Sequence, residues 1–176
     1  MSKPTLLDVQ SFLQTAYQLK ATVTPLPGEY DANFHVVATD GQQFVLKLMH
    51  PEQPDELVEL QIAALNHLAD TQPVPRVVPL ASGEQVGRFQ QRMAWMISHL
   101  PGQLYATVRP QTAVLRHNLG QLLGNLHLAL ANFAHPTLHR SLKWDLSQAG
   151  WIREQLPLIE DDGRQAIVQR FLADYE

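Results

Sequence analysis

The spacing of hydrophobic residues changes along the first half of the chain, and this change predicts the order of helices and strands. Residues 6–19 place apolar side chains three and four positions apart, which is typical of an amphipathic helix. The segments "NFHVVAT" and "QQFVLKLM" then predict two strands. Because Asp40-Gly41 lies between them, we expect the two strands to form a hairpin.

A second amphipathic segment, "PDELVELQIAALNHLAD", predicts a helix over residues 55–69, and the prolines that follow would end it. Its apolar stripe consists of Leu57, Leu60, Ala64, Leu65 and Leu68. The next segment, "RVVPLASGEQVGRFQQRMAWMISHL", predicts two more strands. We therefore expect one antiparallel sheet of about five strands, with the helix of residues 55–69 packed on one face.

After residue 110 the pattern becomes helical. The segment "TAVLRHNLGQLLGNLHLALANF" predicts a long helix with a well-buried stripe, which consists of Leu115, Leu119, Leu122, Leu123, Leu126 and Leu130. The segments "WDLSQAGWIREQL" and "RQAIVQRFLADYE" predict two further helices. The fold class predicted from these patterns is α+β, with a strand-rich first half and a helical second half.

Composition removes several classes of function. The 176 residues carry a formal net charge of −4 and no lysine- or arginine-rich block, so we expect no nucleic-acid partner. Cysteine is absent, which excludes disulfides, thiolate metal sites and cysteine nucleophiles. The chain has no apolar run of membrane-spanning length and no leader-like N-terminus, so we expect no membrane partner and a cytoplasmic location.

Lys47 is the residue that first suggests a function, because it interrupts the apolar strand "VLKL". A buried ammonium group is costly unless a negative partner meets it. Alternation along the strand puts Lys47 on one face with Val45 and Met49. We expect the opposite face, formed by Phe44, Leu46 and Leu48, to pack under the helix of residues 55–69. A surface strand with a solvated lysine is the alternative interpretation.

Six segments, taken in order, resemble the aminoglycoside phosphotransferase and choline kinase-like family, and most closely its hydroxylysine kinase branch. They are "LPGEYDANFHVVATDGQQFVLKL", "PDELVELQIAALNHL", "PVPRVV", "ISHLPG", "LGQLLGNLHLAL" and "KWDL". The resemblance implies a protein-kinase-like fold. Residues 1–97 would form its nucleotide-binding N-lobe, residues 98–102 a hinge, and residues 103–176 the first helices of a truncated helical lobe.

By this resemblance Lys47 matches the phosphate-binding lysine of the family, and Glu59 matches the helix glutamate that holds it. A concentrated cation on a rigid strand suits phosphates, which carry dense negative charge. The helical wheel favours a different carboxylate, because Glu59 lies opposite the apolar stripe whereas Glu56 flanks it. We predict an ion pair of Lys47 with Glu59 and keep Glu56 as the alternative.

The remaining nucleotide contacts also follow from the resemblance. The loop "PGEYDAN" matches the segment that covers the nucleotide, with Gly28 and Asn33 as its candidate contacts. Val45 would cover an adenine while the lysine reaches the phosphates. In the hinge, Ser98 and Leu100 would offer a backbone C=O and N–H to the base edge. The implied cofactor is ATP or GTP with Mg²⁺.

One part of the family pattern is missing from the chain. An H-x-D-x-x-x-x-N loop and a later metal-binding aspartate are expected in such kinases, and neither is present. The nearest candidate, Asp145, follows Lys143 where histidine is required and precedes Gly150 where asparagine is required. We expect the catalytic loop and the metal ligands to lie beyond Glu176, and we assign no metal ligand within the chain.

The predicted function is that of the N-terminal part of a small-molecule kinase that phosphorylates a hydroxyl of an amino acid, amino alcohol or aminosugar. We expect the chain alone to bind nucleotide weakly, to transfer no phosphate and to self-associate through exposed apolar surface. The hydroxylysine kinase branch further implies a fused aminotransferase domain in the full protein. The alternative is a catalytically inactive nucleotide-binding or regulatory module of the same fold.

Overall fold

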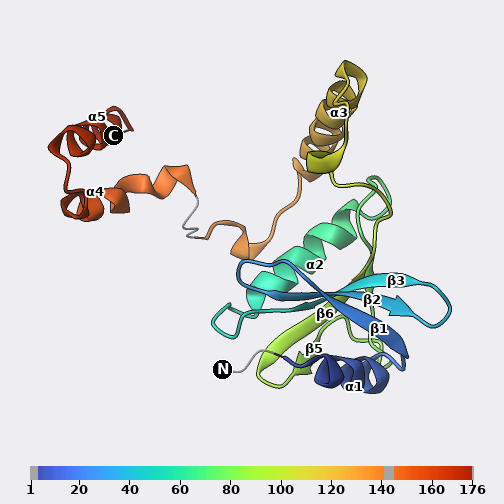
Figure 1. Ribbon diagram of the computed structural model, residues 1–176. Helices are drawn as coiled ribbons and strands as arrows, with labels where there is room; N and C mark the ends of the chain where they lie inside the picture. Colours follow the sequence, from blue (N-terminus) through green and yellow to red (C-terminus); the bar gives the residue numbers. More distant parts are fainter. Residues whose placement is uncertain (1–3, 141–144, 176) are drawn as a thin grey trace. The chain divides into compact units, whose positions relative to one another are not determined.

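The computed structural model describes residues 4–140 and 145–175 (Figure 1). The chain divides into two compact units, Met1–Thr137 and Leu138–Glu176. The first unit contains the whole sheet and three α-helices, and the second is helical.

The sheet of the first unit has six strands in the order β1-β2-β3-β6-β4, and β5 also pairs with β6. The strands are β1 (Ala21–Leu26), β2 (Ala32–Ala38), β3 (Gln43–Leu48), β4 (Val77–Val78), β5 (Gly87–Phe89) and β6 (Arg92–Ser98). All their pairings are antiparallel, which confirms the predicted sheet. The central strand β3 lies between β2 and β6.

The turn between β2 and β3 sets the register of the sheet. Gly41 has a φ of 88°, in the left-handed region that glycine adopts without steric cost. The Asp40 carboxylate accepts a hydrogen bond from the Gln42 N–H at 3.0 Å, and bonds from Gln42 lower the pKa of Asp40. From this turn the pairing runs back to place Asn33 opposite Lys47. The predicted hairpin is therefore confirmed.

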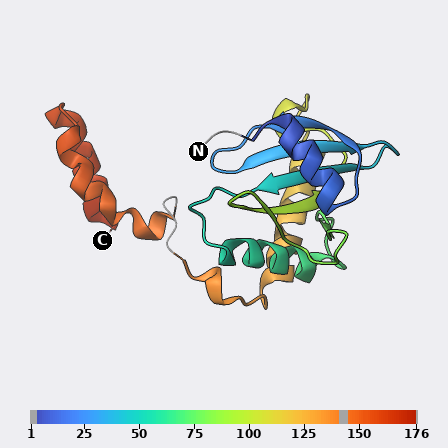
Figure 2. The same ribbon diagram turned by 90° about the horizontal axis from the view of Figure 1, so that it is seen from below.

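Helices cover both faces of the sheet, as Figures 1 and 2 show for α1 (Leu6–Ala16) and α2 (Glu56–Leu68). One core cluster joins α1 to the sheet; its buried members include Val9, Leu13, Phe34, Val36, Leu46, Leu48, Ala94 and Met96. The other joins α2 to the sheet through Met49, Leu57, Val58, Ile62 and Trp95. The predicted packing of residues 55–69 on one face is thus confirmed.

The prediction for the lysine-free face of β3 is wrong. Leu46 and Leu48 are buried beneath α1, and Phe44 packs at the edge of the same cluster. They do not pack under α2, because α2 lies on the face of Lys47, where Met49 and Trp95 form its contacts. Lys47 and α2 therefore share one side of the sheet.

The long helix α3 (Ala113–Leu130) closes the first unit, with the Thr112 hydroxyl accepting a hydrogen bond from the Leu115 N–H at its start. Its contact with α2 includes a bond of 2.8 Å between His67 Nε2 and the Ala129 carbonyl. The expected burial of its leucine stripe is wrong, because α3 has no buried residue and Leu122 and Leu123 are 43% and 48% exposed. Within the first unit, α3 packs mainly against α2.

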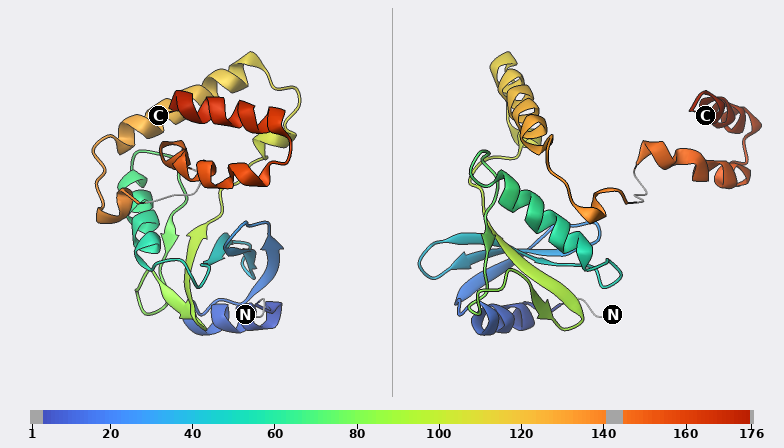
Figure 3. Two further views of the ribbon diagram at one scale, coloured as in Figure 1. Left: turned by 90° about the vertical axis from the view of Figure 1, so that its left-hand side faces the viewer. Right: turned by 180° about the vertical axis from the view of Figure 1, so that it is seen from behind.

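The second unit is a short run of helical segments that ends in the red helix α5 (Asp162–Tyr175) (Figure 3). The segment predicted as one helix begins at Trp144, outside the described residues, and continues as a 3-10 helix, η3 (Leu146–Trp151), and one turn, α4 (Ile152–Gln155). Among the residues of this unit that the structure describes, Leu156 and Leu172 are buried. Across the described ranges, no helix combines the length and apolarity needed to cross a membrane.

Candidate functional site

Lys47 lies near the end of the central strand β3, on the face that α2 covers. Its side chain is 20% exposed, so it is not directed into bulk solvent. Its neighbour across the β3–β6 pairing is the buried Trp95, and Nζ lies 5.9 Å from the centre of the indole ring. An ammonium at this distance from an aromatic face gains electrostatic stabilisation, which partly offsets the cost of burying the charge.

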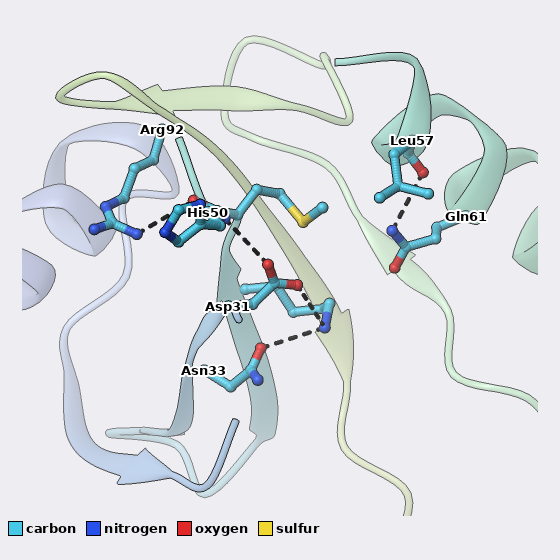
Figure 4. Close-up of polar contacts among 8 residues, drawn as sticks. Asp31, Asn33, His50, Leu57, Gln61 and Arg92 are labelled. Carbon is cyan, nitrogen blue, oxygen red and sulfur yellow. Dashed lines mark hydrogen bonds and ion pairs between the residues drawn. The ribbon is translucent and has the colours of Figure 1, made fainter. Parts of the chain in front are cut away.

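The partners of Lys47 come from the loop that leads into β2 and from the start of β2 itself. Nζ lies 3.7 Å from Asp31 Oδ2 and donates a hydrogen bond of 3.3 Å to Asn33 Oδ1. The second oxygen of Asp31 accepts a hydrogen bond of 3.1 Å from the backbone N–H of His50. Figure 4 shows Asp31 between His50 and Asn33, so this carboxylate holds the lysine and the end of β3 together.

The predicted ion pair of Lys47 with Glu59 is therefore wrong, and so is its alternative with Glu56. Both glutamates are exposed, and neither makes an ion pair in the part of the chain that the structure describes. Glu59 instead borders a shallow hollow with Asn66, Glu84 and His135. The reason lies in the helix, because the side of α2 that faces the sheet is apolar.

Gln61 is a polar residue of α2 that the sequence interpretation missed. It is half-buried, and its amide Nε2 donates a hydrogen bond of 3.2 Å to the carbonyl of the buried Leu57, one turn earlier. Figure 4 shows Gln61 on α2, across from Asp31 and Asn33. Only carboxylates were considered as partners for Lys47, so the amide was missed. The four-residue spacing from Leu57 would have placed Gln61 on the inner side of the helix.

The loop from Gly28 to Asn33 folds back tightly on itself. A Cβ atom on Gly28 would collide with the backbone oxygen of Asp31 and lie 2.8 Å from Asn33 Nδ2. Glycine is thus required here because two parts of the loop approach closely. Such a loop can bring backbone N–H groups near the phosphates of a nucleotide, which is the ligand predicted from the sequence.

The other predicted nucleotide contacts lie farther along the sheet from Lys47, and the side chain of Ser98 points to the opposite face, together with Phe44. Val45 is half-buried and shares the face of Lys47. Ser98 pairs with Phe44, three positions from the pair of Lys47 and Trp95, which is roughly 10 Å along the strands. Both the N–H and the hydroxyl of Ser98 bond to the backbone of Arg76, at 2.8 and 2.9 Å.

Leu100 follows two residues later and is 49% exposed. Lys47, Val45 and the chain leaving β6 therefore follow one another along the strands. The nucleotide roles of Gly28, Asn33 and these residues remain predictions, as does the division at residues 98–102. In the described ranges, no three His, Cys, Asp or Glu residues gather as metal ligands would.

The chain matches a protein-family model over most of its length. Residues 22–176, which are most of the chain, match the model of the phosphotransferase enzyme family. Among curated proteins, hydroxylysine kinase of Danio rerio is 26% identical over 193 residues. The match covers 99% of this chain and 54% of that protein, so the chain spans about half the length of this relative.

Two solved structures share the fold. An amicoumacin kinase in complex with AMP-PNP and Ca²⁺ has a TM-score of 0.71 at 15% identity, and covers 92% of this chain and 50% of its own. A spectinomycin phosphotransferase in complex with ADP and spectinomycin has a TM-score of 0.65 at 13% identity, with coverages of 92% and 49%. At these identities the likeness establishes the predicted kinase-like fold, an antiparallel sheet with helices, and nothing finer.

Proposed function

The chain belongs to the phosphotransferase enzyme family, and from this premise we propose that it forms the nucleotide-binding half of a small-molecule kinase. Lys47 is the observation that carries the proposal. It is a largely buried cation on the central strand, and one carboxylate and one amide hold it in place. A positioned ammonium is suited to contact the α- and β-phosphates of a nucleotide.

The other contacts that we propose surround this lysine. Gly28 and Asn33 would bring the loop over the phosphates, Val45 would cover the base, and the backbone of Ser98 and Leu100 would contact the base edge. The nucleotide would be ATP or GTP with Mg²⁺, where the metal neutralises phosphate charge that one lysine cannot. The complexes of the two similar kinases with AMP-PNP and ADP support a nucleotide of this class.

We propose that the acceptor is a hydroxyl of an amino acid, amino alcohol or aminosugar. The name of the relative from Danio rerio, hydroxylysine kinase, supports the first of these, and the two antibiotic kinases support the third. As a consumer of nucleoside triphosphate, the kinase would act in the cytoplasm. A fused aminotransferase domain, which only the family resemblance implies, and self-association of the chain through its exposed apolar surface also remain proposals.

The 176 residues contain no H-x-D-x-x-x-x-N pattern, and this observation favours a second candidate. In the first, the catalytic aspartate and the metal ligands come from sequence outside these residues, and the chain alone transfers no phosphate. In the second, the chain is a nucleotide-binding or regulatory module without catalysis. Phosphate transfer by the natural protein to 5-hydroxylysine, choline, ethanolamine or kanamycin would support the kinase and exclude the module without catalysis.

The direct test is calorimetric titration of the chain with MgATP and MgGTP, beside the variants Lys47→Met and Lys20→Met. Loss of a charge-assisted contact of about 1.5–3 kcal/mol should weaken nucleotide binding roughly 10- to 100-fold in Lys47→Met. Lys20 is exposed and directly precedes β1, at the end of the strand away from the loop, so Lys20→Met makes the same chemical change outside the site. Equal binding by both variants would refute the proposed phosphate contact, and turnover by the 176-residue chain would refute its inactivity.

A further inference from the structure

A cavity of about 500 Å³ lies on the other side of the loop from Lys47. Its walls come from the start of α1, the ends of β1 and β2, the loop itself and the start of β6, with Leu6, Leu26, Tyr30 and Phe34 among them. The volume falls within the range of small-molecule sites, roughly 300–1,000 Å³. Lys47 is not among its lining residues.

The cavity belongs to the α1 side of the sheet. Along β6 the side chains alternate, so that Ala94 and Met96 join the α1 cluster whereas Trp95 joins the α2 cluster. Arg92 has the same parity as Ala94 and lines the cavity. The cavity and the proposed nucleotide site therefore occupy opposite faces, with the loop from Gly28 to Asn33 bordering both.

Arg92 is the feature that gives this cavity a chemistry. It is 8% exposed and is the buried charged residue of the described core. Its guanidinium carries five N–H donors, and NH1 makes a bond of 3.3 Å to the Met49 carbonyl. Throughout residues 4–140 and 145–175, no carboxylate lies within ion-pair distance of it.

A buried cation that lacks an anionic partner is unfavourable, and arginine does not lose its proton to relieve the cost. The planar fork of a guanidinium matches the oxygens of a carboxylate or a phosphate, with which it forms two parallel hydrogen bonds. Figure 4 shows the Arg92 guanidinium beside His50, which also lines the cavity. The remaining walls are mostly apolar, so they suit a ligand with an apolar body.

The charges around the cavity are mixed, which limits the ligand to a small anion. Glu29 and Asp31 also line the cavity, and they would repel an extended or highly charged anion. Asp31 already accepts a hydrogen bond from the His50 N–H and lies beside Lys47, whose positive charge compensates the charge of the carboxylate. A single oxyanion held at Arg92, with an aromatic or aliphatic body beside Leu26 and Phe34, meets the fewest unfavourable contacts.

We propose that this cavity is a second ligand site, which binds a small apolar molecule through one carboxylate or phosphate group paired with Arg92. The site does not depend on the nucleotide function proposed for Lys47, because the two cations lie on opposite faces. The ligand would contact the same loop that holds Lys47, so the position suits an effector rather than a second acceptor.

The test follows the backbone amide signals of the chain by NMR during titration with phenyl phosphate, benzoate and benzyl alcohol. We expect the two anions, or one of them, to shift the amides of Leu6, Tyr30, His50 and Arg92 at millimolar concentration. Binding of one anion alone would identify the oxyanion class. Benzyl alcohol has the same ring without the charge, and its affinity should be at least about tenfold lower.

Two variants with matched chemistry separate this site from Lys47. Arg92→Met keeps an apolar stem and should weaken anion binding at least about tenfold, whereas Lys47→Met should change it less than about twofold. Arg92→Met should also fold without loss of melting temperature, because it removes an unpaired buried charge. If the variant fails to fold, the positions of the shifted backbone amides in the natural chain show whether the anions bind at this cavity.

Three results would overturn the proposal. They are equal binding of benzyl alcohol, the absence of any shift at the cavity with either anion, and loss of anion binding in Lys47→Met rather than in Arg92→Met. The last of these would assign the anion to the proposed nucleotide site.

Discussion

Replacement of Asp31 by asparagine changes the partner of Lys47 with little change in shape. In the structure Asp31 Oδ2 lies 3.7 Å from Lys47 Nζ, and the two side chains are 18% and 20% exposed. An asparagine keeps an oxygen that can accept the hydrogen bond from the His50 N–H, at 3.1 Å in the natural chain. The variant therefore removes the negative charge and leaves the local backbone contact in place.

The size of the effect follows from the distance and the exposure. At an effective dielectric constant of about 20, two unit charges 3.7 Å apart attract by roughly 4.5 kcal/mol. Desolvation and the ordering of two side chains offset most of this attraction, and pairs near a surface contribute up to about 1 kcal/mol. We therefore expect Asp31→Asn to lower the free energy of unfolding by about 1 kcal/mol.

Nucleotide affinity should change in the opposite direction. If Lys47 must exchange Asp31 for a phosphate, a pair worth about 1 kcal/mol reduces nucleotide affinity roughly fivefold in the natural chain. Asp31→Asn removes this competition, and it also removes a negative charge that would repel phosphates. Calorimetric titration with MgATP should therefore show affinity about fivefold higher in the variant than in the natural chain.

The matched control is Asp55→Asn, which makes the same change at an ion pair of 2.6 Å with Arg88. These partners are about half exposed, so their pair should contribute less to stability, and nucleotide affinity should stay unchanged. Weaker nucleotide binding in Asp31→Asn, by a factor similar to that of Lys47→Met, would refute this reasoning. Asp31 would then be part of the binding site rather than a competitor for the lysine.

Three further predictions concern the loop, the core and the surface. Gly28→Ala should weaken nucleotide binding more than it lowers stability, because the added Cβ collides with the Asp31 backbone oxygen and opens the loop; equal affinity by calorimetry would contradict this. The buried Tyr17 hydroxyl has no hydrogen-bond partner within the described structure, so Tyr17→Phe should raise the free energy of unfolding by about 1 kcal/mol in urea titrations. Burial raises the pKa of Tyr17, so the natural chain should lose stability above about pH 10, where the unfolded tyrosine ionises, and Tyr17→Phe should lose less. The exposed Leu122 and Leu123 should promote self-association, so their replacement by glutamine should lower the average mass in sedimentation equilibrium, and an unchanged mass would assign association to another surface.

The hairpin could be predicted from the sequence, but its register could not. Counting outward from a two-residue turn at Asp40-Gly41 would bring Phe34 opposite Lys47, whereas the structure pairs Asn33 with Lys47, because Ala38 bonds to Gln42 and the turn holds one residue more. The contact between Asp31 and Lys47 could not be predicted by counting either. It depends on how the loop between β1 and β2 closes on itself at Gly28, which is a property of the folded loop rather than of strand alternation.

The faces of β3 show a second limit of sequence reasoning. Alternation correctly separated Lys47 from Leu46 and Leu48, since adjacent side chains point to opposite sides of a strand. Alternation does not say which helix covers which side. The helix nearest in sequence, α2, was expected over the leucines, but α1 covers them although it precedes them by about thirty residues.

The glutamate prediction failed for a related reason. A carboxylate was sought on α2 because a buried lysine requires a partner. The inner side of α2 is instead apolar apart from the amide of Gln61, so the charge is supplied by a loop. Stability requires only that some carboxylate reach the lysine, and sequence alone does not determine which element supplies it.

Asp31 joins the two faces of the sheet, since its two oxygens serve different partners. One accepts the His50 N–H at the rim of the Arg92 cavity, and the other lies beside Lys47. A ligand at Arg92 that shifts His50 would therefore move the carboxylate that competes for the lysine. We therefore expect benzoate to change MgATP affinity in the natural chain, and Asp31→Asn to remove most of the change. A double-mutant cycle measures this coupling, and equal coupling with and without the Asp31 charge would show that it passes through another contact.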